Sequence, residues 1–236
     1  MNSNSKFFMM TIVIGSLLIG LLSYIQVQSS SAQSIGLPGL ENIPGYRLFE
    51  EAVNDKAGAS GAATATPDYR IIDKAVVARD ANKLQAVLQA HGHIPTKGEG
   101  GAFGYGILTA EGLKAVMVST THAGIKDSED QRTAADPRWH NHYVSLGSPT
   151  GTPCGIDPQV TAITFQSPGD VVVSKNKAIM SNLPGKFTGT SPPPDGKSIT
   201  INPGTNVKDI VSFVLKPIDG KVCVTNIHPA DKVIKN

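Results

Sequence analysis

Two histidines stand two residues apart in the segment RWHNHYVSL, which covers residues 138–146. In a β-strand, side chains at positions i and i+2 share one face, and their Cα atoms lie about 6.8 Å apart. The imidazoles of His140 and His142 can therefore both turn a nitrogen toward one ion at a distance of about 2 Å. The spacing predicts a strand that contributes two ligands to a transition-metal site.

A third histidine, His122, ends an apolar segment that precedes this strand in the chain. Antiparallel pairing of the two segments would place it on the same face as the other two histidines. Imidazole nitrogens are ligands that suit zinc and copper. We therefore expect a zinc or copper site made by His122, His140 and His142. The alternative is that these are ordinary strand histidines, solvated or hydrogen-bonded to nearby acids.

The loop between the two segments is polar and carries three acidic residues. Carboxylates beside histidine ligands complete a metal site or orient its imidazoles. The candidates for either role are Asp127, Glu129 and Asp130.

Other catalytic motifs are absent from the sequence. It has no H-E-x-x-H helix, no G-x-S-x-G nucleophile elbow, no phosphate loop and no dinucleotide fingerprint, so we expect no nucleotide cofactor. The His-x-His strand and the later Gly169-Asp170 pair are similar to the two motifs of cupins. No Glu follows His142 at the cupin distance, however, and no His follows Asp170, so the cupin ligand set is incomplete.

Charge excludes one class of partner. The 236 residues include 21 Lys and Arg against 19 Asp and Glu, which gives a formal net charge of +2. The basic residues are scattered and form no stripe, so we expect no nucleic-acid binding.

The N-terminus predicts export. A short polar start with Lys6 precedes the apolar run 7–25, and Ser30 and Ala32 suit the small-residue positions of a cleavage site. Residues 1–32 are thus a signal peptide or, because the apolar run is long enough to span a bilayer, an uncleaved membrane anchor. The protein would be extracellular or attached to the cell envelope, and it would meet a membrane only through this segment.

The predicted export also indicates the state of the two cysteines. Outside the cytoplasm an even pair of cysteines is most simply a disulfide, so we expect Cys154 to bond Cys223.

The rest of the chain divides by pattern. Residues 33–67 are expected to be a linker with a short helix, and residues 68–97 an amphipathic helical segment, with Asp80 as an N-cap and Leu84, Val87 and Leu88 on one face. Residues 98–236 are expected to form a β-sandwich or a barrel-like domain, with a two-residue turn at Asp219-Gly220 that pairs Leu215 with Val224 and Phe213 with Asn226. The expected strands fall within 101–108, 114–124, 140–147, 160–166, 170–176, 177–183, 198–204 and 209–216.

Three functional hypotheses fit these patterns. The favoured one is an exported, non-catalytic β protein that binds a transition metal through the strand histidines. The second is a metal-dependent extracellular enzyme that uses the same histidines around an open coordination position. The third is a metal-free binding or structural module of the cell envelope, whose protein or small-molecule partner is unknown.

Overall fold

The computed structural model describes residues 65–147 and 153–236. The predicted signal peptide or anchor and the short helix expected in the linker lie outside these residues. Within the described ranges there is no helix with the length and apolar character needed to cross a membrane. The helical elements of this part of the chain are the short 3-10 turns η2 (Asp68–Arg70) and η3 (Gly112–Lys114).

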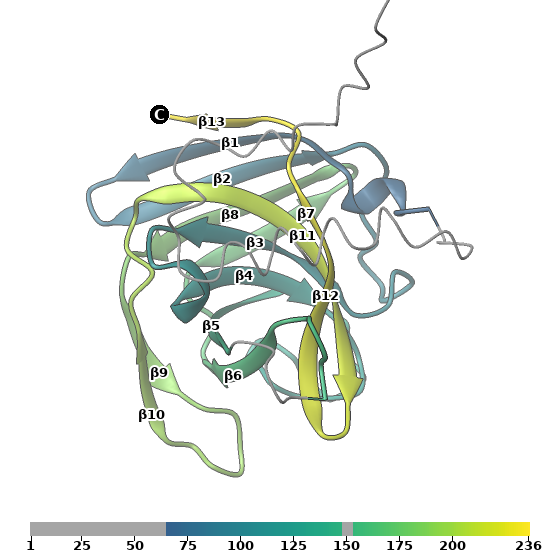
Figure 1. The fold of residues 1–236 in the computed structure, drawn as a ribbon, viewed down its shortest axis with the longest axis vertical. Helices are drawn as coiled ribbons and strands as arrows, with labels where there is room; N and C mark the ends of the chain where they lie inside the picture. Colours follow the sequence, from purple (N-terminus) through teal and green to yellow (C-terminus); the bar gives the residue numbers. More distant parts are fainter. Residues whose placement is uncertain (1–64, 148–152) are drawn as a thin grey trace, which may run out of the picture. The chain divides into compact units, whose positions relative to one another are not determined.

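Most of the described chain is β-structure, and six strands close into a barrel (Figure 1). The prediction of a barrel-like domain is thus confirmed, and each expected strand appears at its place in the sequence. The barrel strands, in spatial order, are β11 (Val207–Ile218), β12 (Lys221–Pro229), β6 (Gln159–Ile163), β5 (His140–Gly147), β4 (Val116–Thr121) and β3 (Phe103–Thr109).

A second, five-stranded sheet packs against the outside of the barrel. Its buried side chains, such as Leu88 and Met180, form one core with Tyr105, Met117 and Tyr143 from the outer face of β3, β4 and β5. A two-stranded ribbon of β9 (Phe187–Thr190) and β10 (Ser198–Ile201) completes the fold. The sheet order is β13 (Val233–Lys235), β1 (Ile72–Asp80), β2 (Lys83–Ala90), β8 (Lys177–Pro184) and β7 (Asp170–Ser174).

The helical prediction for residues 68–97 is wrong, because this segment forms the antiparallel hairpin of β1 and β2. Asp80 ends β1 instead of capping a helix, and it pairs with Lys83 across the turn. Burial in β2 alternates, with Leu84 and Leu88 buried together with the small alanines between and after them. The four-residue spacing of Leu84 and Leu88 fits the two-residue period of a strand as well as one helical turn. Packing against the barrel determined that this segment is a strand.

One side of the barrel contains the β11–β12 hairpin and a disulfide. β11 and β12 meet at the predicted turn with Leu215 opposite Val224, but a register shift between Ser212 and Val214 replaces the expected pairing further along. The predicted bond between Cys154 and Cys223 is present. Cys223 also pairs with Gln159 where β12 meets β6, so the disulfide lies at the contact between these two strands of the barrel. Closing a loop of 69 residues contributes about 4 kcal/mol in the chain-entropy account.

Alternation along the barrel strands separates two environments. On β5, Tyr143 points outward into the core beneath the sheet, whereas Val144 and Leu146 belong to a second apolar cluster inside the barrel. Met117 and Val118 divide in the same way on β4. Period-two alternation thus gives the barrel a lumen with apolar walls.

Candidate metal centre

The three predicted histidines meet at one end of this lumen. β4 and β5 are antiparallel, with Thr120 opposite His140 and Val118 opposite His142. His140 and His142 continue the inward-facing row of β5, and His122 follows the last residue of β4. All three side chains are buried, with exposed fractions of 4, 0 and 1% for His122, His140 and His142.

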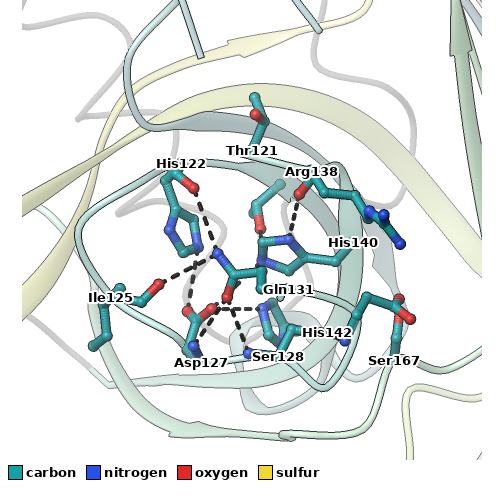
Figure 2. A network of polar contacts seen from close by, with 12 residues as sticks. Thr121, His122, Ile125, Asp127, Ser128, Gln131, Arg138, His140, His142 and Ser167 are labelled. Carbon is teal, nitrogen blue, oxygen red and sulfur yellow. Dashed lines mark hydrogen bonds and ion pairs between the residues drawn. The ribbon is translucent and has the colours of Figure 1, made fainter. Parts of the chain in front are cut away.

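The loop between β4 and β5 brings the Asp127 carboxylate close to the three imidazoles (Figure 2). Asp127 Oδ2 lies 3.3 Å from His122 Nε2, and Oδ1 lies 3.5 Å from His140 Nε2 and 3.6 Å from His142 Nε2. These distances exceed the usual 2.7–3.2 Å of an N–H···O hydrogen bond. The carboxylate is therefore surrounded by imidazoles without being closely bonded to any of them.

Gln131 holds this loop in shape. Its Oε1 accepts hydrogen bonds from the backbone N–H groups of Asp127 and Ser128, at 3.0 and 3.2 Å. Its Nε2 donates to the carbonyl oxygens of Ile125 and Asp136, at 3.3 and 3.1 Å. The Gln131 side chain is buried. Its amide makes the hydrogen bonds to the loop backbone that regular secondary structure would otherwise make, and these bonds position Asp127.

Backbone carbonyls orient two of the imidazoles. His142 Nδ1 lies 2.7 Å from the carbonyl oxygen of Thr164, and His140 Nδ1 lies 2.7 Å from that of Arg138. Since a carbonyl oxygen only accepts, both Nδ1 atoms must carry the proton. In the neutral tautomer each Nε2 then presents a lone pair toward Asp127, which is the outer hydrogen bonding that metal-bound histidines usually show.

The charges and lone pairs of this cluster favour a bound cation. Asp127 Oδ1 and His142 Nε2 are buried and have no hydrogen-bond partner within the described ranges. Burial alone would raise the pKa of the Asp127 carboxyl, but its three imidazole neighbours hold that pKa below its ordinary value. Burial also lowers the pKa of His140, against the opposing influence of Asp127, which favours the neutral imidazole that a metal needs. Facing lone pairs in a buried site repel one another unless a proton or a metal ion lies between them.

The spacing of the four groups suits one ion. Their potential ligand atoms all lie within 4.8 Å of one another. Around a tetrahedral ion with bonds of about 2.1 Å, ligand atoms lie about 3.4 Å apart, close to the three distances between Asp127 and the imidazoles. Thr120 Oγ1 lies 3.2 Å from His140 Nε2, and this hydroxyl would have to turn away when an ion binds. The cluster could therefore hold a metal ion after small adjustments.

The other two predicted acids lie outside the cluster. The Glu129 side chain accepts a hydrogen bond from the backbone N–H of Ser167, and the backbone N–H of Asp130 bonds the Ser128 hydroxyl. Asp127 lies among the potential ligand atoms of the cluster, which corresponds to the ligand role, one of the two roles that the sequence left open for the loop acids. The part played by Gln131 had no signal in the sequence, because it depends on how the loop closes on itself.

The disulfide indicates an oxidising compartment. A scan against protein-family models, a search of curated proteins and a search of solved structures each found no match to this chain.

Proposed function

We propose that this protein binds one transition-metal ion, zinc or copper, through His122, His140, His142 and Asp127. The observation that carries the proposal is the buried meeting of a carboxylate with the Nε2 atoms of three imidazoles, at distances too long for good hydrogen bonds. A buried group of this composition is unfavourable when empty and favourable around a cation.

The ligand chemistry selects the class of metal. Calcium and magnesium prefer shells made wholly of oxygen, whereas three imidazoles with one carboxylate suit zinc and copper. The described residues place no thiolate in the site, since both cysteines are in the disulfide. We expect zinc or copper accordingly, with carbonyl-bound Nδ1 atoms on His140 and His142 raising the basicity of those ligands.

We also propose that the metal-binding domain is exported and acts outside the cytoplasm, where the bond between Cys154 and Cys223 is stable. The favoured role is binding without catalysis, because four protein ligands fill a tetrahedral shell as structural sites do. One observation favours the enzyme alternative: Asp127 and His142 also line the barrel cavity, so a small molecule can approach the ion.

The test is metal analysis of the protein purified without an affinity histidine tag. We expect close to one zinc or copper ion per chain, and none in His140→Ala/His142→Ala. The matched control is His91→Ala, because His91 pairs with Asp73 at the surface of the protein, with 63% of its side chain exposed. That variant should keep its metal.

A second readout is thermal unfolding with added metal. A ligand at a thousand times its dissociation constant stabilises a protein by about 4 kcal/mol, which for a chain of this size raises Tm by roughly 8–16 °C. The shift should appear in the parent and in His91→Ala but not in the double variant. A folded parent that holds no metal and takes up neither added zinc nor added copper would contradict the proposal.

A further inference from the structure

The lumen beneath the metal centre is a cavity of about 140 Å³. Its walls are mainly aliphatic and aromatic side chains and one glycine, contributed by all six barrel strands together with the loop residues Ile125, Asp127 and Pro192. Of the lining residues, three carry polar side chains, namely Thr120, Asp127 and His142. All three belong to the metal centre or touch it, so the polarity of the cavity is concentrated at that end.

The cavity also communicates with solvent. Ile125 and Val222 line it and are 56% and 37% exposed, two of the few large apolar side chains that the described surface presents. Ile125 lies in the same loop as Asp127, two residues before it. An apolar rim at the opening of an apolar cavity is what a hydrocarbon ligand would need to pass.

Charge at the polar end selects the other part of the ligand. A divalent ion held by three neutral imidazoles and one carboxylate keeps a net charge of +1, and Asp127 is the one charged side chain among the lining residues within the described ranges. A positive charge next to apolar walls is poorly solvated there, so it favours an anionic oxygen as a fifth ligand, an expansion that four-coordinate zinc sites can undergo.

We infer that the lumen binds a small apolar molecule that carries one anionic oxygen, with its hydrocarbon part between the barrel strands and its oxygen on the metal ion. The inference rests on the proposed function, because the ion supplies the charge that the oxygen meets. The size fits an aromatic ring, since an apolar cavity of about 150 Å³ is known to hold benzene. Aromatic carboxylates are the simplest members of this class.

The test uses the full chain loaded with Co²⁺, whose visible spectrum reports a new oxygen ligand. Benzoate and acetate share the carboxylate and differ by the ring. Burying the ring should make benzoate bind at least about tenfold more tightly than acetate. Benzene, which lacks the carboxylate, should enter the cavity but leave the Co²⁺ spectrum unchanged.

Matched variants locate the binding. Val116 lines the cavity on β4, four residues from Thr120, whereas Val172 on β7 is 58% exposed and does not line it. Val116→Phe should weaken benzoate binding at least about tenfold and leave acetate binding and Co²⁺ content unchanged. Val172→Phe should change none of these. Val224→Phe, on a different barrel strand, fills the same cavity if Val116→Phe does not fold.

The outcomes separate this inference from the metal proposal. Stoichiometric Co²⁺ with equal affinities for benzoate and acetate would overturn the inference while the metal site stands. Benzoate binding that both cavity-filling variants leave intact would overturn it as well. A chain that binds no metal would remove both proposals, and the metal analysis alone would show it.

Discussion

Two aspartates in the protein interior, Asp127 with 14% of its side chain exposed and the buried Asp209, have pKa values shifted in opposite directions. Asp209 is 4% exposed in β11, and burial raises its pKa to about 6 despite a hydrogen bond from the backbone N–H of Ile210 and the influence of Lys235. Burial acts on Asp127 in the same direction, but the three imidazoles around it outweigh burial and lower the pKa of its carboxyl.

The difference teaches what a carboxylate needs to act as a ligand. Burial by itself favours the neutral acid, which cannot bind a cation. A charged carboxylate inside the protein requires a positive or hydrogen-bonding neighbour, and Asp127 has one when a proton or a metal ion lies between its oxygens and the histidine Nε2 atoms. Asp209 is therefore a structural residue, and Asp127 is the residue around which the metal site is built.

The largest effect is expected from removing the charge of Asp127. Asp127→Asn should lower zinc affinity by two to three orders of magnitude, because four ligands share a binding free energy of roughly 10–16 kcal/mol. Competition with a metal chelator at neutral pH measures the change. Asp209→Asn is the matched control and should bind zinc as the parent does. Equal zinc affinity in Asp127→Asn and the parent would remove Asp127 from the ligand set.

Asp209→Asn should instead change the dependence of stability on pH. The pKa of Asp209 is about 6 in the folded state and about 3.9 in the unfolded chain, so the folded state binds more protons between these values. The stabilisation by the protonated acid is complete below about pH 4 and is lost as the pH rises through 6. Two pKa units correspond to about 3 kcal/mol.

Urea unfolding at pH 4, 6 and 7.5 tests this expectation. The parent should lose up to about 3 kcal/mol more than Asp209→Asn between pH 4 and pH 7.5. Parallel pH profiles for the two proteins would show that burial does not raise the pKa of Asp209 above its unfolded value.

A smaller effect is expected from the residue that positions Asp127. Gln131→Leu leaves the backbone N–H groups of Asp127 and Ser128 without their acceptor, so the carboxylate is no longer held toward the histidines. Loss of such an outer partner usually weakens metal binding by 10–100-fold. Gln166→Leu is the control, because Gln166 Oε1 also accepts a backbone N–H, that of Thr190, and Gln166 makes no hydrogen bond to Asp127 or to the three histidines within the described ranges. Both variants should be compared by chelator competition, and equal zinc affinities would contradict the role given to Gln131.

The smallest effect is expected at the surface. His91 and Asp73 form the same kind of pair as His122 and Asp127, at 3.2 Å, but their side chains are 63% and 38% exposed. Exposed ion pairs contribute about 0–1 kcal/mol. Asp73→Asn should therefore change the free energy of unfolding by less than about 0.5 kcal/mol and leave metal content unchanged. A loss of metal in Asp73→Asn would show that the exposed pair of His91 and Asp73 contributes to the metal site, contrary to this expectation.

Part of this structure could be predicted from local patterns. The i, i+2 spacing of His140 and His142 places both on one face of a strand whatever the fold, and the antiparallel partner brings His122 beside them. The runs of β-branched residues between turn residues predicted the barrel strands for the same local reason. The disulfide between Cys154 and Cys223 followed from the predicted compartment and an even number of cysteines.

Other features depended on contacts between distant segments. The spacing of Leu84 and Leu88 suits a helix and a strand equally, and the barrel surface on which they pack decided in favour of the strand. The charges of Asp127, Glu129 and Asp130 are equivalent in the sequence, and the loop closed by Gln131 selected Asp127.

By itself, the sequence determined that His140 and His142 share one face of a strand and that His122 follows its neighbouring strand, because side-chain alternation is a property of the strand backbone. Only the tertiary structure decided that they enclose a buried carboxylate at the end of an apolar lumen. That arrangement requires closure of the barrel, and it comes from pairing segments that lie far apart in the chain.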